Sequence, residues 1–281
     1  MVNSDIKQEI FAIICGDNRQ IFLANLLKHD LHSVHVYGFD DEILKTFGFL
    51  KESLDEVINK STNIILPIPV SREGDKILMS NIEINSEFIQ KIKNKRVFCG
   101  MKNKVKNPEF QNLDIKDYYD CENFKILNSI PTAEGALKLA LDNSNQTIYG
   151  STCLIAGYGR IGKILAKILK DLGANVYINT ISEEDKTWSQ TWGYKIIDIQ
   201  EAETLDFDFI FNTVPELIFD KFILNKISSR CVIIDLASIK GVDYEYAKKL
   251  GIQASQELGV SGRFFALTSA KIIKQSIYNI M

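Results

Sequence analysis

The chain has 281 residues, of which 46% are hydrophobic and 25% are charged, and its formal net charge is −3. These proportions are typical of a globular protein with a large core, and they give no electrostatic reason to expect binding to nucleic acid or to an anionic membrane. No apolar run approaches the ~20 residues that span a bilayer, and the first ten residues lack the pattern of a secretory signal. The five cysteines are scattered, so we expect a cytoplasmic protein without disulfides or a structural metal.

The first half of the chain alternates short apolar runs with stretches of helical spacing. Strands are predicted at residues 11–15, 34–37, 63–66 and 97–99, and helices after residue 20 and at residues 54–59 and 86–93. Strands that alternate with helices imply a parallel, doubly wound sheet, because each parallel pair needs a crossover connection. We therefore predict a flavodoxin-like α/β domain over residues 1–127.

A helix that bridges two domains is predicted to begin near Asn128. Pro131 is tolerated in the first turn of a helix, and Ser129 is a residue type that caps one. Small and apolar residues then repeat on one face of the helix. The second domain is predicted over residues 128–265, and an amphipathic helix at about residues 266–281 is expected to pack back on the first domain.

The stretch from residue 150 to residue 180 carries the most specific pattern. A strand at residues 152–156 is followed by Gly157-Tyr158-Gly159-Arg160-Ile161-Gly162, a helix that stops at Gly173, and a second strand at residues 175–178. This full βαβ context makes the G-x-G-x-x-G a dinucleotide-binding fingerprint rather than an ordinary turn. Gly157 permits the tight turn, Gly159 lets the backbone approach a diphosphate, and Gly162 lets the helix pack on the strand. The helix N-terminus offers free N–H groups to the phosphates, so we predict a Rossmann domain with residues 157–162 in the cofactor site.

Polar residues follow the later strands of this domain. Strands are predicted at residues 195–197, 208–212, 231–234 and 252–254, with helices at residues 183–192 and 244–250. Ligands of doubly wound sheets bind outside the carboxyl ends of the strands. We therefore place Thr213, Val214 and Pro215 beside the nicotinamide half of the cofactor, with an ordinary turn as the alternative. Asp235, at the end of another strand, is also assigned to the cofactor site.

The choice between NAD and NADP depends on the end of the second fingerprint strand. An NAD site normally has a carboxylate about twenty residues after the glycines, whereas this strand ends in Asn179 and Thr180, without an acid. A carboxylate would repel a 2′-phosphate, and small polar groups can bind it. Arg160 and Lys186 are available to supply positive charge. We therefore predict NADP, with NAD as the less favoured cofactor.

The absence of histidine from the second domain limits the mechanism. All three histidines lie between residues 29 and 35, and a metal site built from them alone is not expected. The common 2-hydroxy-acid dehydrogenases use a histidine near the cofactor as the base, because its pKa is close to the working pH. The proton acceptor here is therefore a carboxylate, a hydroxyl or water, or the oxidation needs no strong base. Hydride loss from a dihydro ring that becomes aromatic fits the last option.

With these residues in place, the chain resembles the family of the dipicolinate synthase A subunit, from spore-forming bacteria, over nearly its full length. The likeness rests on Gly16-Asp17-Asn18-Arg19-Gln20, Tyr37-Gly38-Phe39-Asp40, Ile64-Ile65-Leu66-Pro67 with Ser71, Asn128-Ser129-Ile130-Pro131-Thr132-Ala133-Glu134-Gly135, Asn212-Thr213-Val214-Pro215 and Asp235-Leu236-Ala237-Ser238. The resemblance implies that the protein oxidises dihydrodipicolinate, a small dicarboxylate, to dipicolinate with NADP during sporulation. It also implies a partner protein, a flavoprotein-like B subunit. The sequence leaves open whether the chain also forms a homo-oligomer.

The resemblance also implies residues for the substrate on the first domain, which is then the substrate domain. Arg19, the backbone of Gly16 and Asp17, and Ser71 are assigned to the substrate site, since the two substrate carboxylates need cationic or N–H partners. The alternative for Arg19 is an ion pair with Asp17 or Asp40.

Further site residues are expected on the bridging helix. Asn128, Ser129 and Thr132 are expected to donate hydrogen bonds to the substrate, with a helix cap as the alternative for Ser129. Asn128, Glu134 and Ser238 are assigned catalytic roles. Glu134 is the nearest plausible proton acceptor, and the alternative is that it only complements the helix dipole from the first turn.

The chain departs from the family pattern at two places. Ile239 and Lys240 stand where the family has a basic residue and a proline, and the stretch 260–266 lacks two family prolines but keeps Arg263, which is assigned to the substrate. Two alternatives therefore remain: another NAD(P)-dependent two-domain dehydrogenase, and a non-catalytic nucleotide-binding subunit.

Overall fold

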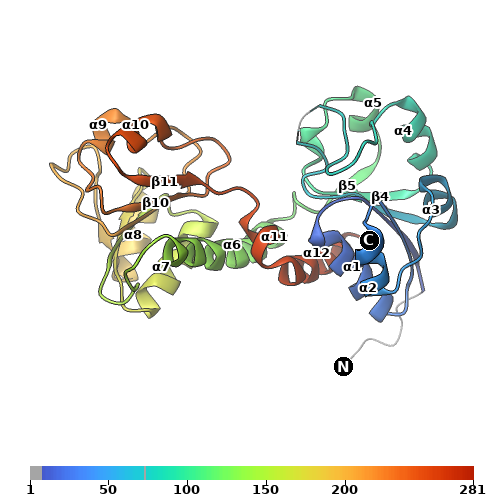
Figure 1. The fold of residues 1–281 in the computed structure, drawn as a ribbon, viewed down its shortest axis with the longest axis horizontal. Coiled ribbons are helices and arrows are strands. Elements are labelled where there is room, and N and C mark those ends of the chain that lie inside the picture. The colour runs from blue at the N-terminus through green and yellow to red at the C-terminus, as the bar shows by residue number, and fades with distance from the viewer. Residues whose placement is uncertain (1–7, 73) are drawn as a thin grey trace. The chain divides into compact units, whose positions relative to one another are not determined.

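The computed structural model describes residues 8–72 and 74–281, and the chain divides into two compact units. Unit 1 comprises Met1–Asn128 and Phe265–Met281, and unit 2 comprises Ser129–Phe264. Each unit contains one parallel β-sheet with helices on both faces (Figure 1). The predicted fold class, two doubly wound α/β domains, is confirmed.

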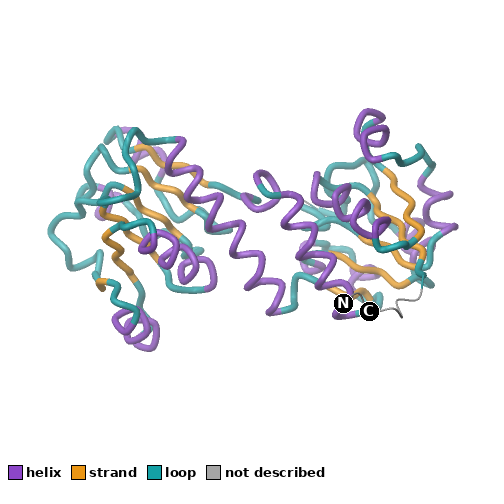
Figure 2. The backbone as a smooth tube through the Cα atoms, turned by 90° about the horizontal axis from the view of Figure 1, so that it is seen from below, coloured by secondary structure: helices purple, strands orange, loops and turns teal. Residues whose placement is uncertain are grey.

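The sheet of unit 1 has the strand order of a flavodoxin-like domain. Its strands are β1 (Ile10–Ile14), β2 (Ser33–Tyr37), β3 (Asn63–Ile65), β4 (Arg96–Cys99) and β5 (Ile115–Asp117). They are parallel and run in the order β2-β1-β3-β4-β5. Figure 2 draws the strands in orange and the helices in purple. Side chains alternate across β1, so that Phe11 and Ile13 enter one core while Ala12 and Ile14 enter the other. The strand order reverses between β1 and β3, which makes their carboxyl ends a ligand position.

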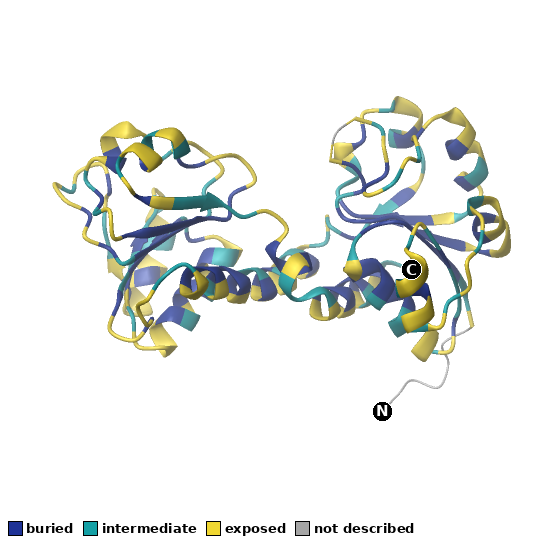
Figure 3. Cartoon of the chain, viewed as in Figure 1, coloured by how far each residue is buried: buried dark blue, intermediate teal, exposed yellow. Residues whose placement is uncertain are grey.

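The helices of unit 1 cover both faces of this sheet. They are α1 (Asn18–His29), α2 (Asp41–Phe47), α3 (Leu54–Lys60), α4 (Ser86–Ile92), α5 (Pro108–Gln111), α12 (Ala266–Ile280) and the short 3₁₀ helix η1 (Lys102–Lys104). Buried residues of α1, α2 and α12 share one core, and those of α3, α4 and α5 share the other. Figure 3 shows the buried strands beneath helices whose outer faces are exposed. Helix α2 was not predicted, and neither were α5 and β5, which span only four and three residues.

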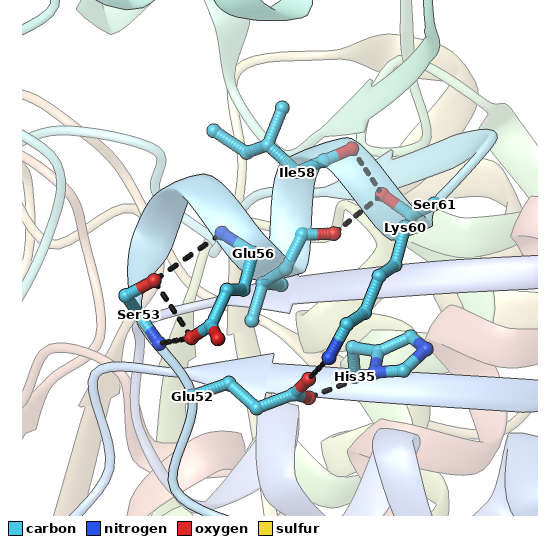
Figure 4. A network of polar contacts seen from close by, with 8 residues as sticks. His35, Glu52, Ser53, Glu56, Ile58, Lys60 and Ser61 are labelled. Carbon is cyan, nitrogen blue, oxygen red and sulfur yellow. Dashed lines mark hydrogen bonds and ion pairs between the residues drawn. The ribbon is translucent and has the colours of Figure 1, made fainter.

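The start of α3 shows how local sequence fixes an element in this unit. Ser53 caps the helix, since its Oγ accepts from the N–H of Glu56 at 3.3 Å while the Glu56 carboxylate accepts from the N–H of Ser53 at 2.8 Å (Figure 4). The preceding residue, Glu52, contacts Nδ1 of His35 at 2.7 Å and also accepts from Nζ of Lys60. His35 lies on β2 and Lys60 ends α3, so Glu52 joins the helix to the sheet.

The C-terminal helix α12 packs on unit 1. Its buried residues Ala270 and Ile273 join the core that α1 and the sheet form. At the polar edge of this contact, Asp30 accepts from Nζ of Lys274 and from the hydroxyl of Tyr278, both at 2.7 Å. Apolar burial and a charged pair therefore both hold α12 in place.

The long helix α6 (Glu122–Asp142) begins earlier than predicted. Pro131 lies inside this helix rather than in its first turn, where a proline costs no hydrogen bond. The preference of proline for helix starts was therefore misleading at this position. Ser129 is consequently not an N-cap and Glu134 is not in the first turn, so the alternative roles proposed for them as cap and dipole partner are wrong.

The sheet of unit 2 has the strand order of a Rossmann domain. Its strands are β6 (Thr152–Ala156), β7 (Asn175–Asn179), β8 (Lys195–Ile196), β9 (Phe209–Asn212), β10 (Val232–Asp235) and β11 (Gln253–Gln256). They are parallel and run in the order β11-β10-β9-β6-β7-β8. If β6 is taken as the first strand, this is the doubly wound strand order of dinucleotide-binding domains. The direction in which successive strands are added reverses between β6 and β9.

The helices of unit 2 complete two further cores. They are α7 (Arg160–Asp171), α8 (Glu183–Thr191), α9 (Lys221–Leu224), α10 (Tyr244–Lys249) and α11 (Val260–Phe264). The second half of α6 and α7 share one core with the sheet, and α9 and α10 share the other. The sequence did not predict α9 or α11, which span four and five residues. Within residues 8–72 and 74–281, no helix has the length and apolar character needed to cross a membrane.

Candidate nucleotide-binding site

The glycine fingerprint forms the turn between β6 and α7, where the strand order of unit 2 reverses. Gly157 has a φ of +91°, and a Cβ atom there would lie 2.4 Å from Oγ1 of Thr213. A Cβ atom at Gly162 would lie 2.3 Å from the carbonyl oxygen of Gly157. At Gly159, by contrast, nothing lies within 4 Å of the Cβ position. The fold therefore requires the first and third glycines, whereas the second leaves room for a ligand.

The N-terminus of α7 has the features of an anion site. The helix has 12 residues, and its N-cap, Gly159, provides no side chain to accept from the N–H groups of the first turn. These groups and the helix dipole favour a negatively charged ligand. The uncapped helix and the open space at Gly159 together fit the diphosphate of a nicotinamide dinucleotide.

The side chains of the other fingerprint residues are divided between the core and the surface. Tyr158 is buried, with its ring 6.1 Å from that of Tyr194, and burial raises the pKa of its hydroxyl. Ile161 packs against the same core. These two residues therefore offer a cofactor mainly their backbone atoms, whereas Arg160, the first residue of α7, is exposed.

The Thr213-Val214-Pro215 segment lies against the fingerprint turn. The hydroxyl and the N–H of Thr213 both donate to the carbonyl oxygen of Ala156 at 2.9 Å, and the N–H of Val214 donates to Oδ1 of Asn212 at 3.0 Å. The tripeptide is thus a hydrogen-bonded turn that closes the end of β9 against the end of β6. This places all three residues at the carboxyl edge where the strand order reverses, as a contact with a dinucleotide requires.

The residues predicted to bind a 2′-phosphate follow β7. The backbone carbonyl of Asn179 accepts from Gly157 at 2.8 Å and its Oδ1 accepts from the N–H of Ile199 at 3.3 Å, while Oγ1 of Thr180 accepts from the N–H of Ser182 at 3.3 Å. Lys186, which was expected to supply positive charge, is paired with Glu183 at 2.7 Å. Asn179 therefore shapes the fingerprint turn, and the positive charge expected from Lys186 is offset.

Asp235 has a different role from the one predicted. It is fully buried at the end of β10, and its carboxylate accepts hydrogen bonds from Nδ2 of Asn212 at 2.8 Å and from the hydroxyl of Tyr244 at 2.6 Å. The backbone N–H groups of Ala237 and Gly241 donate to the same carboxylate at 3.0 and 2.8 Å. Protein donors thus engage both oxygens, so Asp235 supports the loop after β10 rather than contacting a cofactor directly.

Sequence reasoning missed Tyr244 and Gly241 in this network. A Cβ atom at Gly241 would lie 2.0 Å from Nδ2 of Asn212, so the loop needs glycine at this position. No spacing rule links Tyr244 to a strand end, and only the fold brings its hydroxyl to Asp235. Ser238, the predicted catalytic hydroxyl, lies in the same loop and is exposed.

In unit 1, the predicted substrate residues lie at the ends of β1 and β3. Arg19 is only 8% exposed, and its Nε and Nη2 bind the carboxylate of Asp17 at 2.8 and 2.6 Å. Nη2 also donates to the carbonyl oxygen of Ile68 at 2.5 Å. Ser71 is buried, and its hydroxyl donates to the carbonyl oxygen of Gly74 at 2.9 Å. Arg19 thus forms the ion pair with Asp17 that was its alternative role, and it joins the two strand ends.

The predicted residues of α6 do not all share one face of the helix. Ser129 is buried, Asn128 and Thr132 are partly buried, and Glu134 is exposed. Residues four apart on a helix are neighbours, whereas residues two apart point in different directions. Asn128 and Thr132 are therefore on the same side of the helix, and Glu134 lies on another side.

Arg263, the last predicted substrate residue, lies on α11. Its Nη2 pairs with the carboxylate of Glu257 at 2.6 Å, and its guanidinium lies 4.5 Å from the centre of the Phe264 ring. In the described part of the chain, no group of three or more His, Cys, Asp or Glu residues is placed to hold a metal ion.

The two units match the models of two different protein families. Residues 10–118 match the family model of the N-terminal domain of the dipicolinate synthase A subunit. Residues 132–243 match that of the NAD binding domain of D-isomer specific 2-hydroxyacid dehydrogenases. The second match and the fingerprint geometry make unit 2 a nicotinamide-dinucleotide-binding domain of the oxidoreductase type.

Relatives of similar length extend the comparison to the whole chain. The A subunit of dipicolinate synthase from Bacillus subtilis strain 168 is 27% identical over 282 residues, which cover 96% of this chain and 95% of that protein. The crystal structure of the corresponding dipicolinate synthase protein from Bacillus halodurans is 30% identical and has a TM-score of 0.84 over 97% of each chain. The apo structure of D-lactate dehydrogenase from Escherichia coli has a TM-score of 0.62 over 96% of this chain and 95% of that one, and at 11% identity it shows the fold alone. The chain therefore belongs to the family of the dipicolinate synthase A subunit.

Proposed function

We propose that this protein is the nucleotide-binding subunit of a dipicolinate synthase, and that it oxidises dihydrodipicolinate to dipicolinate with NADP during sporulation. The observation that carries the proposal is the fingerprint turn, in which Gly157 and Gly162 are sterically required while Gly159 leaves room for a ligand. The similarity to the dipicolinate synthase A subunit extends along both units and supports the choice of substrate. The five free cysteines support a reducing compartment such as the cytoplasm.

The proposed reaction removes two hydrogens from the dihydropyridine ring. One leaves as a hydride, with two electrons, and a bound nicotinamide would be its acceptor. The other leaves as a proton. Because the product ring is aromatic, the proton needs no strong base, which agrees with the absence of histidine from residues 36–281. Glu134 is exposed but lies away from Asn128 on α6, so the proton is proposed to reach it through water, and Asn128 and Ser238 are proposed to orient the ring.

The chain's own residues are proposed to bind and orient the two ligands. The N–H groups at the start of α7 bind the diphosphate, and Thr213-Val214-Pro215 supports the nicotinamide half. Backbone groups at the N-terminus of α1, in a loop that Arg19 holds in shape, are proposed to bind one substrate carboxylate. The further contacts proposed for the substrate are the backbone of Asp17 and the side chains of Ser71, Ser129, Thr132 and Arg263.

The preference for NADP is proposed from the end of β7. Asn179 and Thr180 place no carboxylate at the end of this strand, and Arg160 is exposed at the start of α7. A 2′-phosphate needs such a neutral or positive environment. Titration calorimetry of the purified chain with NADP and with NAD tests the choice, and equal or tighter binding of NAD contradicts it.

The substrate and the partner are tested in one assay. The chain is mixed with NADP and freshly generated dihydrodipicolinate, with and without a candidate flavoprotein-like B subunit, and the absorbance of the reduced nicotinamide is followed. Reduction that requires the partner supports the full proposal, and reduction without it makes this chain sufficient for the reaction. Binding of the nucleotide without turnover in every mixture indicates a non-catalytic nucleotide-binding subunit. Reduction with 2-hydroxy acids instead indicates another NAD(P)-dependent dehydrogenase.

Size-exclusion chromatography with light scattering tests whether the chain also forms a homo-oligomer.

A further inference from the structure

The carboxylate of Asp235 is buried and forms no ion pair with any cation in residues 8–72 and 74–281. Its exposed fraction is 0%, and it accepts four hydrogen bonds, two from the backbone and two from Asn212 and Tyr244. N–H and O–H groups therefore point at both oxygens of this carboxylate. The nearby acid Glu257, whose backbone N–H donates to the carbonyl oxygen of Asp235 at 2.7 Å, is the one that pairs with a cation, Arg263. The network therefore stabilises the charge by dipoles alone.

This charge lies on the half of the sheet that serves the nicotinamide in a Rossmann domain. The fold consists of two mononucleotide-binding halves, and here the second half comprises β9, β10 and β11. Asp235 ends β10 and is in register with Asn212 on one side and with Gln256 on the other. Asn212 in turn is followed directly by Thr213, Val214 and Pro215. The carboxylate is thus at the carboxyl edge of the middle strand of this half.

We infer that Asp235, held by Asn212 and Tyr244, makes the site prefer the oxidised form of the cofactor over the reduced form. The inference rests on the proposed function, because it assumes that a nicotinamide occupies this half of the sheet. The oxidised nicotinamide ring carries a positive charge, and the reduced ring is neutral because it has gained a hydride. A fixed negative charge that solvent does not screen attracts the first ring and has no such interaction with the second.

This preference suits an enzyme that dehydrogenates its substrate. The oxidised cofactor is retained for the reaction, and the reduced cofactor is released more readily afterwards. Tyr244 and Asn212 then act as positioning residues, since they hold the carboxylate in place without adding a positive charge. A cation in their place would cancel the effect, and an asparagine at position 235 would remove it.

The test measures binding rather than turnover. Titration calorimetry on the full chain gives the Kd of the oxidised and the reduced form of the same dinucleotide, for NADP and for NAD. The wild type is expected to bind the oxidised form more tightly, and Asp235→Asn is expected to lower the ratio of the reduced to the oxidised Kd by about 10-fold, as removal of one nearby charge in a low-dielectric site predicts. Tyr244→Phe removes one donor but keeps the charge, so it is expected to leave the ratio unchanged even if both affinities fall.

A matched control changes the same charge elsewhere in unit 2. Asp208 precedes β9, at the amino edge of the sheet, where its carboxylate accepts from the N–H of Thr152 at 2.8 Å. Asp208→Asn alters the net charge equally and is expected to leave the ratio unchanged. An effect of Asp208→Asn as large as that of Asp235→Asn would show that net charge, not this site, sets the ratio, and would overturn the inference.

Each of the other possible results also supports or overturns the inference. It is overturned if the wild type binds the reduced form as tightly as the oxidised form, if Asp235→Asn leaves the ratio unchanged, or if Tyr244→Phe shifts the ratio as much. Should Asp235→Asn fail to fold, as circular dichroism would show, the wild-type ratio and the Tyr244→Phe variant still decide. If the wild type binds neither form, the proposed function fails as well, whereas binding with an insensitive ratio refutes only the inference.

Discussion

Nε2 of His32 lies 3.0 Å from the hydroxyl oxygen of Tyr278, although 246 residues separate the two in the sequence. The Tyr278 hydroxyl donates onward to Asp30 at 2.7 Å, and Nδ1 of His32 accepts from the backbone N–H of Glu9 at 3.2 Å. Because Nδ1 accepts, the neutral ring carries its proton on Nε2 and donates it to Tyr278. A continuous set of hydrogen bonds therefore joins α12 to the start of β1 within unit 1.

The first prediction concerns the contribution of this hydroxyl to stability. Tyr278→Phe keeps the ring but leaves His32 without an acceptor and Asp30 with one donor fewer. We expect the free energy of unfolding of unit 1 to fall by about 1.5–3 kcal/mol, the range for a lost hydrogen bond to a charged group. Urea denaturation measures the change. Tyr149→Phe is the control, since Tyr149 is 80% exposed, and an equal loss in both variants would contradict the prediction.

The second prediction concerns the dependence of stability on pH. Burial lowers the pKa of His32 from its ordinary value of 6.5, and this outweighs the neighbouring Asp30 and Glu9, which act to raise it. The folded state therefore binds fewer protons than the unfolded state between the lowered pKa and 6.5, so stability falls as the pH decreases through this window. His32→Gln is expected to make the slope of stability against pH shallower there. His29→Gln, at the exposed end of α1, is the control, and an unchanged slope in His32→Gln would refute the assignment.

The third prediction concerns Glu52, which lies between two basic groups. Burial acts to raise the pKa of Glu52, but the hydrogen bonds from Lys60 and His35 outweigh it and hold the pKa below 4.5. Its stabilising effect is therefore complete above pH 4.5 and is lost as the pH falls through the lowered pKa. Glu52→Gln is expected to cost about 1 kcal/mol near neutral pH, reduced by solvent screening, and nothing at pH values below that pKa.

A matched exposed pair provides the control for Glu52. Glu87 pairs with Lys91 at 2.9 Å, but its side chain is 76% exposed, compared with 12% for Glu52. Glu87→Gln is therefore expected to change the free energy of unfolding little at any pH. Chemical denaturation at several pH values compares the variants, and a loss in Glu52→Gln that persists in acid would show that the charge is not responsible.

Much of the fold was predictable because its signals are local. The strand β6 and the glycine turn follow from adjacent residues, and the predicted doubly wound sheets are confirmed in both units. The start of α6 was wrong because Pro131 is compatible with two positions in a helix, and only packing decides between them. Phe124 is 1% exposed in the core of unit 1, and this burial extends the helix to residues whose own sequence pattern is weak.

The sequence predicts those parts of the site that a single segment forms, but not those that several segments form together. The positive φ of Gly157 and the contact between Gly162 and Gly157 arise within one turn, whereas the network at Asp235 binds residues up to 23 positions away from it. A carboxylate at a strand end therefore predicted a ligand contact, but burial and four protein donors gave it a supporting role. Arg19 and Asp17 are two residues apart, so the sequence allowed their ion pair as an alternative without showing that Arg19 is buried.

The last prediction separates the two uses of glycine in the fingerprint. At Gly159 the backbone has a φ of −76°, which any residue adopts, and a Cβ atom meets nothing within 4 Å. Gly159→Ala should therefore fold with unchanged stability, yet its methyl group occupies the space proposed for the diphosphate. We expect at least about a 10-fold increase in the Kd for the nicotinamide nucleotide, equivalent to about 1.4 kcal/mol of binding free energy.

Gly162→Ala is the matched variant, with the same methyl group three residues later. Its Cβ atom would lie 2.3 Å from the carbonyl oxygen of Gly157, so α7 has to move away from the turn. We expect a loss of about 1–3 kcal/mol in the free energy of unfolding of unit 2, together with weaker nucleotide binding. Calorimetric titration and urea denaturation on both variants distinguish the two effects. If Gly159→Ala bound the nucleotide as tightly as the wild type, the space at Gly159 would not be the diphosphate position.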